Sequence, residues 1–128
     1  MKEHTVLIVD DEPLILDVWT RILFVAGYDV ECAADAHEAF HALITARVRV
    51  AICYVHLPGA KGLRIADMIR EQFPATAIIL ASDDPLVPPP EALGAAVAAY
   101  IVTPVSSERL LTIVRTAIAW SLDRSRVH

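Results

Sequence analysis

The stretch Val6-Leu7-Ile8-Val9-Asp10-Asp11 decides the fold of this chain. Its four apolar residues, three of them β-branched, predict a strand that is buried on both faces, as in the middle of a parallel sheet. Two carboxylates follow this strand, and Pro13 comes two residues later. Because proline is favoured in the first turn of a helix, a helix is expected to begin there. Sites of open α/β sheets lie at such strand-to-helix crossovers, so Asp10 and Asp11 are candidate site residues.

The length and composition of the chain indicate one globular domain. The chain has 128 residues, of which 55% are hydrophobic and 21% charged. Its net charge of −5 argues against nucleic acid as a direct partner, because phosphate binding needs a basic face. We find no membrane-spanning stretch and no signal peptide, and therefore expect a cytoplasmic protein without a membrane partner. Cys32 and Cys53 fall in predicted strands and are expected to be buried free thiols.

Five apolar runs alternate with five helical patterns. Strands are expected at residues 6–9, 29–33, 48–55, 77–81 and 98–102. Helices are expected at residues 14–26, 36–45, 62–72, a short segment ending near residue 93, and 106–122. Asp35 is the expected N-cap of the second helix. In the first helix, the inward stripe is expected to hold Ile15, Val18, Trp19, Ile22 and Ala26. This alternation predicts an α/β domain with a doubly wound parallel sheet at residues 1–122, followed by a tail or linker stub at 123–128.

The order and spacing of several short pieces resemble a response-regulator receiver domain of the CheY-like kind. The pieces are residues 6–13, 26–28, 55–59 with 62–63, and 100–102 before 104–105. This resemblance covers nearly the whole chain. It implies a flavodoxin-like five-stranded sheet in the order 2-1-3-4-5 with five helices, the first and last of which pack on one face.

The resemblance also implies a chemistry, namely transfer of a phosphoryl group from a kinase phosphohistidine to an aspartate at the end of the third strand. In the family, an acidic pair binds Mg²⁺, and a hydroxyl and a lysine after later strands hold the phosphoryl group. Asp10 and Asp11 fill the acidic pair. The positions of the nucleophile, the hydroxyl and the lysine hold Tyr54, Ala81 and Thr103 instead.

These three departures predict that phosphotransfer is lost. A tyrosine phenol has an unperturbed pKa of about 10, so Tyr54 is neutral at pH 7 and cannot form an acyl phosphate. Thr103 brings no positive charge, and Ser82, one residue past the hydroxyl position, should point to the opposite face of the sheet. We therefore expect an atypical receiver that is not an enzyme and that acts as a phosphorylation-independent interaction module in signal transduction.

No cofactor is expected. Asp10 and Asp11 offer Mg²⁺ at most a weak site, because the third carboxylate is missing. Instead, Tyr54 is expected to plug the pocket and to donate a hydrogen bond to one member of the acidic pair, while the other is solvated or has a raised pKa. Tyr100 holds the position of the switch aromatic in the family, and the alternative is an edge-strand residue with its hydroxyl in water.

Two other readings stay open. One is a receiver with residual phosphotransfer at Asp83 or Asp84, which follow the fourth predicted strand. The other is a zinc hydrolase, because residues 37–41 match the H-E-x-x-H pattern, with His37 and His41 as ligands and Glu38 as base. Against the zinc reading, the expected core stripe of that helix turns both histidines toward solvent; the stripe consists of Ala39, Phe40 and Leu43.

The first and last helices carry more apolar residues than one packed face requires. The residues expected outside the core stripes are Phe24, Leu111, Ile118, Trp120 and Leu122. If they are exposed together, they predict a surface for a signalling protein such as a histidine kinase, or for a homodimer through these two helices. The alternative is a chance scatter of surface apolar residues.

Overall fold

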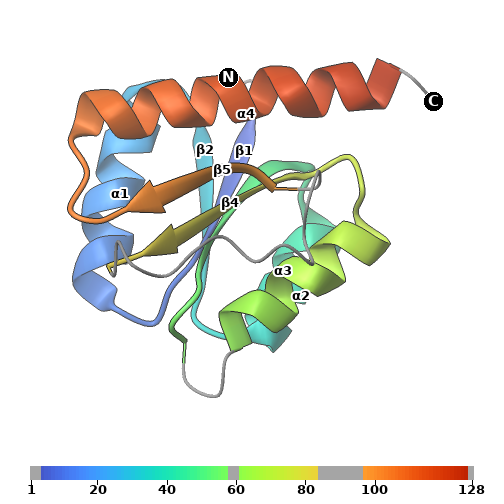
Figure 1. Ribbon diagram of the computed structural model, residues 1–128, viewed down its shortest axis with the longest axis horizontal. Coiled ribbons are helices and arrows are strands. Elements are labelled where there is room, and N and C mark those ends of the chain that lie inside the picture. The colour runs from blue at the N-terminus through green and yellow to red at the C-terminus, as the bar shows by residue number, and fades with distance from the viewer. Residues whose placement is uncertain (1–3, 58–60, 84–96, 127–128) are drawn as a thin grey trace.

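The computed structural model describes residues 4–57, 61–83 and 97–126 (Figure 1). These residues form a five-stranded sheet in the order β2-β1-β3-β4-β5, and every neighbouring pair is parallel. The strands are β1 (Thr5–Val9), β2 (Asp29–Ala33), β3 (Val48–Tyr54), β4 (Ala77–Ser82) and β5 (Val97–Val102). The predicted strand order is therefore confirmed.

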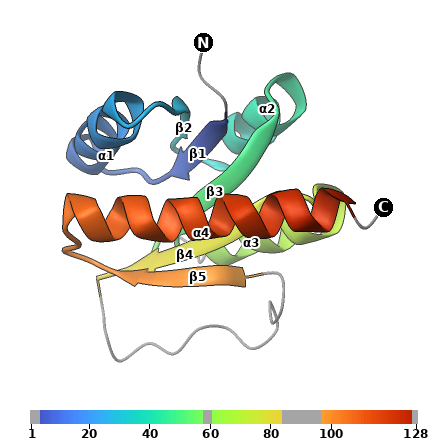
Figure 2. The ribbon, with the colours of Figure 1, turned by 90° about the horizontal axis from the view of Figure 1, so that it is seen from above.

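Four helices cover this sheet in the described part of the chain. They are α1 (Pro13–Val25), α2 (Ala36–Thr45), α3 (Lys61–Gln72) and α4 (Ser107–Arg126). The helices α1 and α4 lie on one face of the sheet, and α2 and α3 lie on the other (Figures 1 and 2). None of these described helices is both long and apolar enough to cross a membrane.

Two helix predictions need comment. The short helix expected to end near residue 93 lies outside the described residues, so four helices are seen where five were predicted. The last helix was expected to end at residue 122, but α4 continues to Arg126. That boundary was wrong because the predicted tail contains no glycine or proline that would end the helix.

The start of α2 shows how local sequence fixes a helix boundary. The Asp35 carboxylate accepts a hydrogen bond from the Glu38 backbone N–H at 2.8 Å, which confirms Asp35 as the N-cap. The Glu38 side chain in turn accepts a hydrogen bond from the Ala34 N–H at 2.9 Å. The two side chains thus satisfy backbone donors on both sides of the helix start, as in a capping box.

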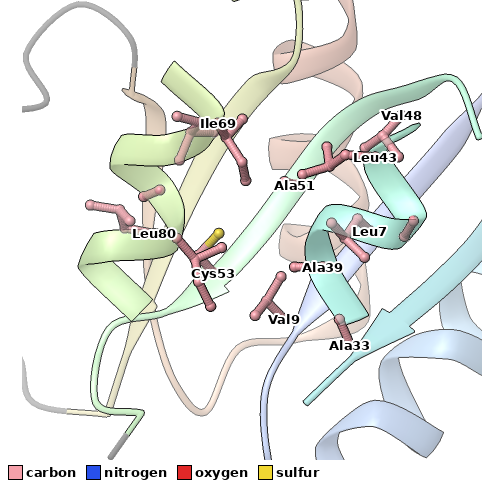
Figure 3. Close-up of a cluster of buried hydrophobic side chains, with 14 of the residues drawn as sticks. Leu7, Val9, Ala33, Ala39, Leu43, Val48, Ala51, Cys53, Ile69 and Leu80 are labelled. Atoms are coloured by element: carbon pink, nitrogen blue, oxygen red, sulfur yellow. The ribbon is translucent and has the colours of Figure 1, made fainter. Parts of the chain in front are cut away.

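The face covered by α2 and α3 is a dense apolar layer. Figure 3 shows side chains of the central strands, such as Leu7 and Cys53, directed at side chains of these two helices, such as Leu43 and Ile69. Cys53 is a buried free thiol, as predicted, and burial raises the pKa of its thiol to about 12. Cys32 was also expected to be buried but is exposed, because β2 is an edge strand whose outer face is only partly covered.

The inward face of α1 differs from its predicted stripe. Trp19 and Leu23 are the two fully buried side chains of this helix, whereas Val18 is 42% exposed and Ala26 lies past the helix end in solvent. On α2, Phe40 is 38% exposed and lies edge-on to Phe73 rather than inside the core. Both errors arise because an apolar period of about 3.6 residues fixes a stripe only to within one neighbouring position.

Gly62 fixes the approach of α3 to the end of β3. A Cβ atom at this position would lie 1.9 Å from the Tyr54 backbone oxygen, far inside van der Waals contact. Only a residue without a side chain allows α3 to begin so close to the strand. This contact holds in place the strand end that carries Tyr54.

Candidate functional site

The carboxyl ends of four strands surround one pocket of about 290 Å³. Its lining comes from the β1–α1 crossover and from the residues that end β3, β4 and β5. This is the place where open α/β sheets bind ligands. The lining residues include all five positions that the sequence singled out for chemistry; they are Asp10, Asp11, Tyr54, Ala81 and Thr103.

The sequence did not indicate four further lining residues as parts of an intact pocket. Asp83 was named only as an alternative acceptor, and Trp19 only as a core residue of α1. Glu12 and Ile15 complete the set. The signal that could have found Trp19 and Ile15 is their position one and two helical turns after the acidic pair, on the helix face that covers the strand ends.

Asp10 is the most buried charged group of the pocket, with 6% of its surface exposed. Its Oδ1 atom accepts a hydrogen bond from the Glu12 backbone N–H at 2.9 Å. Burial raises the pKa of Asp10, and the neighbouring charge of Asp11 adds to this rise, while backbone hydrogen bonds oppose it. Asp11 is exposed. The two members of the acidic pair thus differ, with Asp10 buried at a raised pKa and Asp11 in solvent.

Tyr54 ends β3 and is partly buried, with its ring among the lining of the pocket. Burial raises its pKa, and the charge of Asp83 and a hydrogen bond with that carboxylate raise it further. The phenol therefore stays protonated at neutral pH and donates to Asp83. The expectation that it donates to Asp10 or Asp11 was wrong: the carboxylate that accepts from it belongs to Asp83, just past β4, and Asp10 and Asp11 act on Tyr54 only through their charge.

Ser82 does not replace the missing hydroxyl. Ala81 lines the pocket, while the fully buried Ser82 makes a 2.8 Å hydrogen bond between its Oγ and Nε2 of His56. Adjacent residues of a strand point to opposite faces, so the predicted orientation of Ser82 is confirmed. His56 also lies edge-on to the Tyr54 ring, with centroids 5.6 Å apart.

Thr103 occupies the end of β5. Its backbone N–H donates to the Ser82 carbonyl at 2.8 Å, and its hydroxyl donates to the same oxygen at 3.4 Å. Among the described residues that line the pocket there are four carboxylates and no lysine, arginine or histidine. The pocket is therefore strongly acidic.

Tyr100 lies away from this pocket. It is partly buried on β5, packs against the α2–α3 layer and lines a separate hollow near Arg109. Its strand is the edge strand of the sheet, as the alternative reading expected. A switching role for Tyr100 stays a prediction.

The H-E-x-x-H segment has a structural role at α2. His37 and His41 are exposed, as predicted, and lie near Glu31 and Cys32 around a surface hollow. Glu38, the expected base, is engaged in capping the helix. Within residues 4–57, 61–83 and 97–126, no three histidine, cysteine or acidic side chains are placed to hold a metal ion.

The predicted apolar surface of α1 and α4 is only partly present. Ile118 is buried, and the other three α4 residues, Leu111, Trp120 and Leu122, are partly buried against the core. They were expected to be exposed, but one long helix lying over three strands buries a wider arc than a short one. On this face of the sheet the exposed large apolar side chains lie on α1: Leu14, Val18, Phe24 and Val25.

Residues 6–115 match the family model of the response regulator receiver domain. A response regulator receiver domain protein (CheY-like) from Methanospirillum hungatei is similar at 27% identity over 94% of this chain and 98% of that chain, with a TM-score of 0.83. The signal receiver domain of an HD domain-containing protein from Pseudomonas fluorescens is similar at 26% identity over 95% of this chain and 99% of that chain, with a TM-score of 0.84.

A third similar structure is NtrX from Brucella abortus, at 25% identity and a TM-score of 0.83; the match covers 99% of this chain and 28% of that chain. The matched share of NtrX is thus a minor part of a longer protein. The chain described here belongs to the response regulator receiver family, and it is a CheY-like receiver domain of two-component signalling.

Proposed function

We propose that this receiver domain acts without phosphorylation, as a non-enzymatic protein-interaction module. The observation that carries the proposal is Tyr54 at the end of β3, where the family resemblance places the phosphoryl acceptor. Its raised pKa keeps the phenol neutral, and its hydrogen bond with Asp83 engages the oxygen. A neutral phenol offers no carboxylate from which an acyl phosphate can form.

The other strand ends support the same proposal. Ala81 lines the pocket without a hydroxyl, and the Thr103 hydroxyl is bonded to the Ser82 carbonyl. A phosphoryl group carries about two negative charges near neutral pH. Among four carboxylates and without a cationic side chain in the described lining, such a group would be repelled.

The residues of the pocket do not fit the Mg²⁺ that the family resemblance implies. Asp10 has one carboxylate oxygen bonded to the Glu12 N–H, Asp11 is exposed, and Tyr54 brings a neutral oxygen. Three acidic ligands close enough to share an ion are not found among the described residues. We therefore propose a module that works without a cofactor and binds Mg²⁺ at most weakly at Asp10 and Asp11.

Incubation with acetyl phosphate and MgCl₂, followed by intact mass measurement, tests this proposal. The wild-type protein should gain no phosphate. The matched control is the double variant Tyr54→Asp/Thr103→Lys, which returns the acid and the cation and should gain one acid-labile phosphate. Labelling of the wild-type protein on a hydroxylamine-sensitive bond would contradict the proposal.

A second candidate function is phosphotransfer at Asp83, which is favoured by its place in the same pocket, next to Tyr54. Asp84, the other acceptor considered, lies outside the described residues. In this case the wild-type protein gains a phosphate and the Asp83→Asn variant does not. The same mass measurement therefore separates the two functions.

We propose that the partner is a cytoplasmic signalling protein, such as a histidine kinase, or a second copy of this chain, and that it binds mainly through α1. Leu14 is 65% exposed, Phe24 is 54% exposed and Val25 is 86% exposed, so apolar surface runs along the length of the helix. Sedimentation of the wild-type protein and of Val25→Glu over a range of concentrations tests for the homodimer. An identical monomer in both cases excludes it.

A further inference from the structure

We propose that the pocket at the strand ends binds an organic cation, an ammonium or guanidinium group, between its carboxylates and the aromatic side chains of Trp19 and Tyr54. The proposal goes beyond the interaction role given above, because it assigns a ligand chemistry to the pocket itself. It shares with that role the premise that the pocket does not hold a phosphoryl group.

The first support is a buried carboxylate without a counterion. Asp10 has only 6% of its surface exposed, and it lines the pocket. Its carboxylate accepts hydrogen bonds from the backbone N–H groups of Glu12 and Asp11, but among the described residues it forms no ion pair. A buried charge is normally paired, so this side chain lacks the partner that burial demands. A cation in the pocket would supply it.

The second support is the chemistry of the walls. Besides the carboxylates, the pocket is lined by Trp19, which is 5% exposed, and by Tyr54. Cations placed against tryptophan and tyrosine rings are attracted by the ring quadrupole, and sites for organic ammonium groups use such aromatic walls. The hydrogen bond between the Tyr54 phenol and Asp83 holds an aromatic ring and a carboxylate of the pocket next to each other.

The third support is the size and coordination of the pocket, which favour an organic cation over a metal ion. A volume of about 290 Å³ suits a small ligand or the end of one long side chain. Mg²⁺ requires near-octahedral oxygen ligands at short distances, and the described residues do not group three acidic ligands for it. An ammonium group on an alkyl chain needs no such geometry, and Ile15 offers its chain apolar contact.

The same chemistry could come from a free small amine or from a lysine or arginine side chain of a protein. Both would place a cation among these carboxylates, and the first experiment tests that shared step. Uniformly ¹⁵N-labelled protein is titrated with n-butylammonium chloride at constant ionic strength, with n-butanol as the neutral counterpart. We expect saturable shifts at Asp10, Glu12, Tyr54 and the Trp19 indole N–H, with the Trp120 indole as the internal reference.

Variants locate the charge that is recognised. Asp10→Asn and Asp83→Asn should each weaken butylammonium binding by about tenfold, since each removes one carboxylate from the pocket. The matched control is Asp17→Asn, which removes an exposed carboxylate from α1 outside the pocket and should leave binding unchanged. The amide spectrum of each variant shows that it is folded.

A second titration separates the two sources of the cation. Acetyl-Gly-Lys-Gly-amide is compared with acetyl-Gly-Gln-Gly-amide and with butylammonium. Tighter binding of the lysine peptide assigns the pocket to a protein side chain, and binding of butylammonium alone assigns it to a free amine. Equal shifts with n-butanol, or saturation by MgCl₂ but not by butylammonium, would overturn the proposal. Acetyl phosphate labelling is measured separately, so this proposal and the phosphorylation-independent role can fail independently.

Discussion

The end of β1 and the ends of β3, β4 and β5 meet at one pocket but carry different kinds of residue. β1 is followed by Asp10 and Asp11, the acidic pair that the family resemblance implies. At the other strand ends, Tyr54 is the last residue of β3, Ala81 the last but one of β4, and Thr103 follows β5. Both sets are held by the same parallel sheet in the same order. The difference teaches that the sheet depends on its buried apolar runs, while single residues just past the strands decide the chemistry.

The largest effect is expected where the backbone of α3 approaches the end of β3. Gly62→Ala should lower the free energy of unfolding by about 3 kcal/mol, because its Cβ would lie 1.9 Å from the Tyr54 carbonyl oxygen and α3 would have to move. Urea unfolding followed by tryptophan fluorescence measures this change.

Gly27→Ala is the matched control for that variant. Gly27 has a φ of 106°, but a Cβ there meets nothing within 4 Å, so the cost should be about 1 kcal/mol, from backbone strain alone. Equal losses in the two variants would show that the close approach at the end of β3 does not constrain the fold.

The next effect concerns the β1 side of the pocket. Asp10→Asn should raise the free energy of unfolding at pH 7 by about 0.5–2 kcal/mol, because it removes a buried charge and keeps an acceptor for the Glu12 N–H. Folding raises the pKa of Asp10, so the folded state binds this proton more tightly. Wild-type stability should therefore fall as the pH rises through that pKa, and then level off.

Unfolding by urea at several pH values between about 3 and 8 measures this dependence. The Asp10→Asn variant should lack this part of the decline. A variant less stable than the wild type at pH 7 would show that the Asp10 charge is compensated in the folded protein.

A substitution at the end of β3 should change the free energy of unfolding less. Tyr54→Phe removes the hydrogen bond to Asp83 and should lower the free energy of unfolding by about 0.5–1 kcal/mol. Folding also raises the pKa of Tyr54, so the stability that its neutral form contributes is lost as the pH rises above about 10. Tyrosinate absorbance should show one alkaline transition fewer in the variant. If the transition that is lost lies at the ordinary phenol pKa of about 10, the pocket does not perturb Tyr54.

The smallest effect belongs to a carboxylate outside the pocket. Asp17 forms an exposed ion pair with Arg21 one turn along α1, at 3.4 Å. Asp17→Asn should change the free energy of unfolding by about 0.3–0.5 kcal/mol, in the direction of lower stability. Thermal unfolding of this variant beside Asp10→Asn compares an exposed and a buried acid. Opposite signs are expected, and a shift in the same direction would remove the distinction.

Much of this fold could be predicted from the sequence because its strands are fully buried. Apolar runs such as residues 77–81 indicate buried parallel strands when they alternate with helices, and turn residues mark their ends. Helix faces were harder to predict, as Val18 and Ile118 show, because exposure there depends on how much of the sheet a helix covers. That is a tertiary property.

The site was predicted in its members but not in its contacts. The spacing of the chain located Asp10, Asp11, Tyr54, Ala81 and Thr103 at the strand ends, since parallel strands end at one edge of a sheet. The partner of the Tyr54 phenol was not predictable, because it depends on which of several nearby acids points toward the ring. Trp19 was missed for a related reason, since a residue can belong to the core and line a pocket at once.

The hydrogen bond between Tyr54 and Asp83 shows what a charged side chain at residue 54 would meet in the pocket. Aspartate at residue 54 alone would place another carboxylate near Asp10 and Asp83, in a pocket whose described lining carries no positive side chain. Charge repulsion opposes this single substitution until a second one, such as lysine at residue 103, relieves it. The residues at positions 54 and 103 are therefore coupled through the charge of the pocket, although they lie on different strands.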